Sequence, residues 1–203
     1  MKRKIRFCRK VIWSGIIAGT FMLVACAGNE AQEGTSVTIN KNGAVSSHIV
    51  SSFDKSYYDE DELQQRILQE VLSYNQTSGA DSVSVEKIEV QDSVAVVDMT
   101  YAQAADYAGF NSGVFFLGNA FKAQSEGYDL NKVLYGAEDS MKTVGMSDIL
   151  AMTDYTLLIT DVKDPIALSG KAAYISDNVT VSKNLKTVSF DGESEELAYV
   201  LYK

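Results

Sequence analysis

The sequence predicts an α+β fold: an antiparallel sheet with one long amphipathic helix packed on it and short additional helices. Three observations lead to this fold class. Two short segments near residue 40 alternate polar and apolar residues around a turn, residues 59–75 repeat apolar residues at helical spacing, and strand-like segments dominate after residue 156. An early hairpin, one long helix and then mostly strands is an order typical of α+β domains.

The first predicted element is a β-hairpin. Residues 36–40 alternate like a strand, residues 41–43 form a turn, and residues 44–53 are again strand-like. The Asn42-Gly43 step favours the positive φ angles that tight hairpin turns require. We expect the ordered domain to begin at Val37.

The long helix follows this hairpin. Asp59 is placed to cap it with Glu62 at the third helical position, and the acidic residues 60–62 suit the positive end of the helix dipole. An apolar stripe recurs every three or four residues and is widened by two further leucines: Leu63, Ile67, Val71 and Tyr74, with Leu68 and Leu72. The helix is expected to end near Asn75 and to pack one face on a sheet.

The remaining elements are shorter. Residues 83–90 and 94–101 predict a second hairpin, whose second strand is apolar on both faces and is expected to be central and covered by the helix. Residues 102–111 and 148–152 predict short helices, whereas residues 113–146 give no clear pattern. Residues 156–162 predict a buried strand. An antiparallel meander is expected from Pro165 onward, with strands at residues 166–168, 171–176, 179–182, 187–190 and 197–202.

The first 26 residues have a different composition from the rest. Six basic residues and no acid precede an apolar run at residues 11–24: Lys2, Arg3, Lys4, Arg6, Arg9 and Lys10. A basic segment followed by an apolar segment and a small residue is the pattern of an export signal. The apolar run is shorter than the roughly 20 residues that a permanent membrane-spanning helix needs. We therefore expect the leader to be removed.

Residues 23–26, Leu-Val-Ala-Cys, resemble the lipobox of bacterial lipoproteins. The resemblance covers only the first 26 residues. It implies that a diacylglyceryl group is attached to the Cys26 thiol and that cleavage before Cys26 makes this residue the new N-terminus. Two alternatives stay open: an ordinary secretory signal with an incidental cysteine, or a leader kept as an anchor.

The resemblance to a lipobox implies that the chain has three parts. These are a signal peptide at residues 1–25, the lipidated cysteine with a flexible tether at residues 26–36, and a single α+β extracytoplasmic domain at residues 37–203. The second cysteine, Cys8, lies in the leader, so the domain has no thiol for a disulfide, a metal site or a nucleophile. Its length argues against the two-lobed solute-binding components of transporters.

The charge of the chain limits its partners. The whole sequence carries a net charge of −9, and the domain without its basic leader is more acidic still. Such a surface repels phosphate backbones and anionic headgroups. We expect no nucleic-acid partner, and we expect the membrane to be met through the lipid on Cys26. The sequence shows no glycine-rich phosphate loop or dinucleotide fingerprint, so no organic cofactor is predicted.

His48 is the only histidine, and without a thiol partner it cannot build a zinc site of the usual type. Ser46, Ser47 and many acids leave a Ser-His-Asp arrangement formally open, but there is no Gly-x-Ser-x-Gly motif. We interpret His48 as a solvated or structural residue.

Acidic clusters suggest two further chemistries. Asp191, Glu193 and Glu195 offer a fragment of a calcium-binding loop, against the simpler interpretation of a solvated turn. A glycoside hydrolase needs two carboxylates about 5 to 10 Å apart, and the 27 acids of this chain include no pair that the sequence singles out.

Aromatic residues provide the last candidate site. Tyr57 and Tyr58, before the long helix, together with Tyr107 and Phe110, could form a stacking platform for sugars or peptides. Ordinary core packing is the competing interpretation for the same residues. The one tryptophan, Trp13, is lost with the leader, which weakens the case for a carbohydrate ligand.

Taken together, these features predict a lipoprotein on the outer face of the cell membrane, or of the outer membrane where two are present. Its expected role is a non-enzymatic binding or accessory module for an envelope protein, peptide or glycan. The alternatives are a cell-envelope hydrolase with paired carboxylates and a purely structural spacer.

Overall fold

The computed structural model describes residues 34–79 and 81–203, and these residues form an α+β fold. The helices are α1 (Glu60–Ser78), α2 (Ala104–Asn111), α3 (Ala120–Ser125) and α4 (Met146–Ala151). The strands are β1 (Ser36–Ile39), β2 (Val45–Ser52), β3 (Val83–Gln91), β4 (Val94–Tyr101), β5 (Phe115–Gly118), β6 (Leu134–Gly136), β7 (Thr143–Val144), β8 (Thr156–Thr160), β9 (Ile166–Ala167), β10 (Ala172–Ile175), β11 (Val179–Val181), β12 (Thr187–Phe190) and β13 (Ala198–Tyr202).

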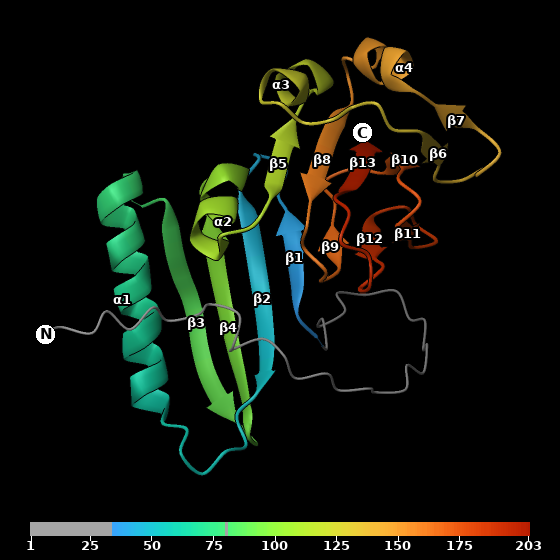
Figure 1. The fold of residues 1–203 in the computed structure, drawn as a ribbon. Helices are drawn as coiled ribbons and strands as arrows, with labels where there is room; N and C mark the ends of the chain where they lie inside the picture. Colours follow the sequence, from blue (N-terminus) through green and yellow to red (C-terminus); the bar gives the residue numbers. More distant parts are fainter. Residues whose placement is uncertain (1–33, 80) are drawn as a thin grey trace, which may run out of the picture.

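The strands are divided between two sheets (Figure 1). Sheet A has seven strands in the order β11-β12-β9-β1-β2-β4-β3, and sheet B has six in the order β5-β8-β13-β10-β6-β7. Most neighbouring strands are antiparallel, but β1 and β9 run parallel. The single sheet that the sequence predicted is therefore replaced by two.

The predicted leader, Cys26 and residues 27–33 of the predicted tether lie outside the described residues. The last part of that tether belongs to the domain: Thr35 Oγ1 donates to the Val50 carbonyl at 3.1 Å and accepts from the Val50 amide at 3.0 Å, and Ser36 opens β1. Of the helices in the described part of the chain, none is long and apolar enough to cross a membrane.

The first hairpin is confirmed. β1 pairs antiparallel with β2, from Ser36 opposite His48 to Ile39 opposite Val45. Gly43 takes a φ of +84° in the turn, which a residue with a side chain rarely adopts.

The long helix is also confirmed, with corrections at its end and on its face. The Asp59 side chain accepts from the Glu62 amide at 2.9 Å, as the predicted cap requires. The helix runs past Asn75 to Ser78. Leu68 and Leu72 are 48% and 59% exposed, so they do not widen the buried stripe. The physical reason is that α1 lies against β3, the edge strand of sheet A, and only a narrow side of the helix meets it (Figure 1).

The second hairpin, β3 and β4, is confirmed as well. Its two-residue turn places Asp92 and Ser93 at positive φ, 51° and 64°. β4 lies between β2 and β3, and one of its faces contributes four buried residues to the core: Ala95, Val97, Met99 and Tyr101.

The predicted antiparallel meander after Pro165 is wrong, although its strands exist. β9, β11 and β12 join sheet A, whereas β10 and β13 join sheet B. Alternation along a strand records which of its faces are buried but not which strand is its neighbour. The chain therefore crosses between the sheets at turns that look alike in the sequence.

Sheet B separates two hydrophobic cores. In β13, Ala198, Val200 and Tyr202 face the core shared with sheet A, α1 and α2, whereas Tyr199 and Leu201 face a second core. The second core is closed by α3, α4 and the segment around β6 and β7 (Figure 1). Apart from α4, these elements belong to residues 113–146, for which no clear pattern was found in the sequence. Both faces of sheet B are therefore buried.

Candidate functional site

A hollow of about 260 Å³ lies between α2 and the edge strand β5. Its α2 wall consists of small side chains, Ala104, Ala105 and Ala108, and its other side is residues 113–117. β5 pairs with β8 along one edge only. Alternate backbone groups of an edge strand point away from the sheet, where they can pair with another extended chain. The hollow therefore combines room for side chains with a strand edge.

Charged and aromatic residues border this hollow. Lys122 forms an ion pair with Glu126 at 3.8 Å, and its ammonium lies 5.8 Å from the centre of the Phe116 ring. Tyr128 packs on Phe116 with ring centroids 5.1 Å apart. Burial, and then the charges of Glu126 and Asp161, raise the pKa of Tyr128. The border of this hollow therefore presents a positive charge, a negative charge and two aromatic rings.

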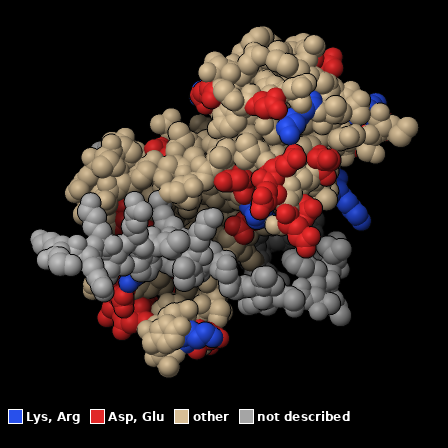
Figure 2. All heavy atoms as spheres, in the orientation of Figure 1, with Lys and Arg blue, Asp and Glu red and all other residues tan. Residues whose placement is uncertain are grey.

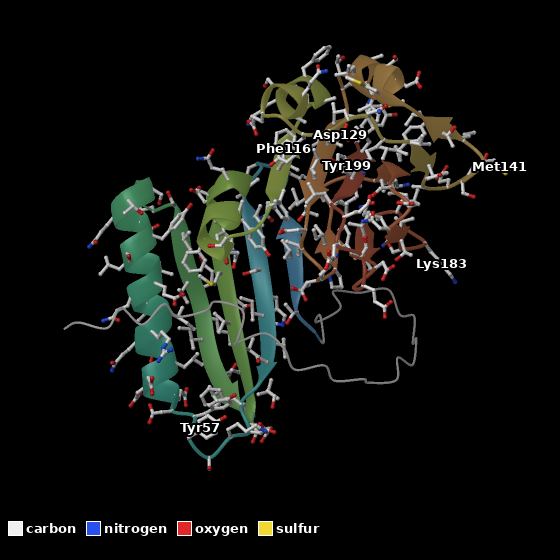
Figure 3. All side chains as sticks on the ribbon, viewed as in Figure 1. Tyr57, Phe116, Asp129, Met141, Lys183 and Tyr199 are labelled. Carbon is white, nitrogen blue, oxygen red and sulfur yellow. The ribbon has the colours of Figure 1, made fainter. Side chains whose placement is uncertain are left out.

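A second hollow, of about 190 Å³, lies over sheet B. It is lined by Lys132, Val133, Tyr135, Ser176, Asp177, Glu196, Leu197 and Tyr199. Lys132 Nζ lies 3.2 Å from Glu196 Oε2, and this hydrogen bond raises the pKa of Lys132. Burial raises the pKa of Tyr199, which lies close to Asp129 (Figure 3). Asp177 and Glu196 thus both line this hollow, but Glu196 is paired with Lys132.

His48 is paired with an acid that the sequence did not single out. His48 Nδ1 lies 2.6 Å from Asp98 Oδ1, and each side chain is about one-third exposed. The pair joins β2 to β4 directly across the strands. Ser46 Oγ instead accepts from Asn40, and Ser47 Oγ lies 3.4 Å from the Tyr101 hydroxyl. No hydrogen bond in the described residues joins His48 to a serine, so the Ser-His-Asp arrangement is not formed.

The calcium hypothesis is not supported by the geometry. In residues 34–79 and 81–203, no group of three or more acidic, histidine or cysteine side chains could hold a metal ion, so Asp191, Glu193 and Glu195 do not converge. Asp191 Oδ1 instead accepts from the Glu193 amide at 3.0 Å. The Lys163 ammonium donates to the carbonyls of Asp191 and Ser194. A lysine therefore supplies the positive charge at this turn.

The two predicted aromatic pairs lie in different environments. Tyr107 and Phe110 are 8% and 9% exposed and pack in the first core, where Tyr107 lies 4.9 Å from the Tyr101 ring and 4.7 Å from that of Phe115. They are core residues, so they cannot form a platform together with the first pair.

Tyr57 and Tyr58 are 75% and 42% exposed. Their rings lie 5.0 Å apart, and Tyr58 lies 4.9 Å from Phe53. Figure 3 shows Tyr57 at the end of the molecule opposite Phe116 and Met141. This exposed pair is the part of the predicted platform that a ligand can reach.

One buried acid, Asp106, and one half-buried acid, Asp164, were missed by the sequence analysis. Asp106 on α2 is 6% exposed, and its Oδ2 has no hydrogen-bond partner among the described residues. Burial raises the pKa of Asp164, which lies between β8 and β9. Neither lines either of the two hollows described above. Their burial depends on contacts between distant segments, for which the local sequence carries no signal.

Comparison of the chain with protein-family models, with curated proteins and with solved structures finds no match.

Proposed function

We propose that this chain is a membrane-tethered extracytoplasmic lipoprotein that acts as a non-enzymatic binding or accessory module. The single observation that carries the proposal is the leader that ends in Leu-Val-Ala-Cys at residues 23–26. Thr35, nine positions after Cys26, is already hydrogen-bonded to β2. An anchor followed closely by a folded domain is the arrangement that a tethered module needs.

The hollow between α2 and β5 supports a binding role. A strand edge with adjacent space for side chains is the surface that proteins use to bind an extended peptide by strand addition. The lining alanines keep this space open, and Lys122 and Glu126 provide charges at its border. The ligand class that fits best is an extended segment of an envelope protein or peptide.

The hydrolase alternative has weaker support. Asp177 and Glu196 share the second hollow, but Glu196 is engaged by Lys132. Asp164, whose pKa is raised by burial as that of a general acid would be, does not line this hollow. The described surface therefore supports peptide binding better than it supports hydrolysis by paired acids.

Replacement of the predicted lipidated residue tests the proposal. The chain expressed in a bacterium supplied with labelled palmitate should incorporate the label and sediment with membranes, whereas Cys26→Ser should lose the label and all stable membrane attachment. Cys8→Ser is the matched control, because it removes the other cysteine of the chain, and it should behave like the unchanged protein. Equal labelling of the Cys26→Ser variant and the unchanged protein would refute lipid attachment at this residue.

A further inference from the structure

One end of sheet A carries a group of apolar side chains, which we name the aromatic tip: the half-buried Phe53 and the exposed Tyr57, Tyr58 and Val94. Tyr57 and Tyr58 are 75% and 42% exposed, and Val94 is 37% exposed. The Phe53 amide donates to the Ser93 carbonyl at 2.7 Å, which fixes the start of the β2–α1 loop against the β3–β4 turn. Tyr58 in turn packs on Phe53, with ring centroids 4.9 Å apart, so the loop residues of the tip are held to the sheet through Phe53.

The N-terminal segment of the chain joins the domain beside this tip. β1 runs antiparallel to β2, with Ser36 opposite His48 and Thr35 bonded to Val50. Moving backward along the chain from Ser36 thus means moving along β2 toward Phe53. Val50 precedes Phe53 by three residues, a distance of about 10 Å in a strand. The described chain consequently begins near the aromatic tip, whereas α3 and α4 lie at the other end of the molecule (Figure 1).

The length of the preceding segment limits how far the domain can stand from its anchor. Thr35 lies nine positions after Cys26, with eight residues between them. Even fully extended, nine residues span only about 30 Å. To bring the α3–α4 end to the membrane, this segment would have to turn back along the sheet.

We propose that the aromatic tip contacts the lipid surface that holds the acyl chains of Cys26; this inference rests on the proposed lipidation. Tyrosine suits the boundary between lipid and water because its ring is apolar and its hydroxyl is polar. Contact at the tip orients sheet A toward the membrane. It leaves the hollow between α2 and β5 facing away, where a partner can reach it.

The charges near the tip favour one kind of lipid. Asp54 forms an ion pair with Lys55 at 3.2 Å, and α1 begins with the exposed acids 60–62 directly after its cap, Asp59. An excess of negative charge is repelled by anionic headgroups. The tip should therefore contact a zwitterionic lipid surface more readily than an anionic one.

The test uses tryptophan fluorescence in the lipidated full chain. Trp13 is the only tryptophan in the sequence and lies in the leader, so Tyr57→Trp provides a single reporter in the processed protein. The matched control is Phe121→Trp on α3, an aromatic residue that is 55% exposed near the other end of the molecule. Both substitutions replace exposed rings and should leave the fold intact. Each protein is reconstituted in phosphatidylcholine vesicles with brominated acyl chains, which quench tryptophan on contact.

We expect quenching of the tryptophan at position 57 to be at least threefold that at position 121, and to fall when half of the lipid is anionic. Equal quenching at the two positions in a protein whose lipid is verified by mass spectrometry would overturn the inference and leave the proposed function standing. Absence of the lipid in that mass spectrum would instead refute the proposed function. Quenching at position 57 that is stronger in anionic vesicles would overturn the charge argument.

Discussion

Tyr74 connects the two helices that cover the inner face of sheet A. Its ring lies at 79° to the Phe110 ring, with the centroids 5.6 Å apart, and its hydroxyl lies over Gly109 of α2. Burial, and then the nearby charge of Asp106, raise the pKa of Tyr74. The sequence placed Tyr74 on the buried stripe of its helix correctly, but the identity of its partners depends on how α1 and α2 meet. This contact joins residues that are far apart in the sequence, so no local sequence pattern predicts it.

Replacing Gly109 tests this contact. Glycine inside a helix normally destabilises it by about 0.5–1 kcal/mol relative to alanine, so Gly109→Ala should stabilise an isolated helix. Here a Cβ atom at position 109 would lie 2.5 Å from the Tyr74 hydroxyl oxygen. We expect this overlap to outweigh the gain, and the variant to lose about 1–2 kcal/mol of unfolding free energy in urea denaturation.

The control for Gly109→Ala is the same substitution combined with Tyr74→Phe, which removes the overlapping oxygen. In that background the alanine should cost much less, so the two substitutions should be non-additive by about 1 kcal/mol. An equal loss in both backgrounds would show that the hydroxyl is not the obstacle.

At the scale of single elements, the sequence predicted best where the signal is local. The Asp59 cap and the positive φ at Gly43 each involve residues within four positions of one another, and both are confirmed. The exposure of Leu68 and Leu72 could not be foreseen, because a helix on an edge strand buries a narrower face than one on the middle of a sheet. Their spacing matches that of the buried residues, so the sequence pattern alone does not separate the two cases.

The β3–β4 turn offers a prediction at this scale. Asp92 and Ser93 both adopt positive φ, which is typical of a two-residue hairpin turn and unfavourable for serine. Ser93→Gly should remove this strain and stabilise the protein by about 1 kcal/mol. The increase should appear as a rise of several degrees in the thermal unfolding midpoint.

Ser84→Gly is the control, because Ser84 is exposed on β3 of the same hairpin but lies within the strand, opposite Thr100 of β4. Glycine there should destabilise the protein by about 0.5–1 kcal/mol. A lower unfolding midpoint for both variants would mean that the positive φ at Ser93 carries no strain.

At the scale of the whole molecule, the sequence predicted the fold class but not the arrangement of the sheets. β8 and β13 are apolar on both faces because sheet B has a core on each side, yet the same pattern would suit the middle of one larger sheet. The hollows depend on this arrangement, since the residues that line each of them come from separate segments of the chain. Lipidation of Cys26 stays a prediction, and the sequence alone allows it because the proposed signal is contained in 26 consecutive residues. Acidic side chains gather in several groups on the face in Figure 2, in keeping with the acidic composition.

Buried tyrosines give the whole domain a characteristic response to alkaline pH. Burial is the main cause of a raised pKa at Tyr101 and Tyr107 in the first core, at Tyr199 facing the second, and at Tyr202. In the unfolded chain these side chains lose their protons near pH 10. Between that pH and the higher folded-state values, the unfolded state binds fewer protons than the folded state. Stability should therefore be insensitive to these groups below about pH 9 and fall as the pH rises above 10.

Urea unfolding measured at intervals from about pH 9 to 11.5 checks this response. Each tyrosine that is protonated only in the folded state adds about 1.4 kcal/mol per pH unit to the slope. Tyr107→Phe removes one such group while keeping the ring that packs between Tyr101 and Phe115, so its stability should fall less steeply. A slope as steep as that of the unchanged protein would show that Tyr107 is ionised equally in both states, and hence that water reaches its hydroxyl in the core between the two sheets.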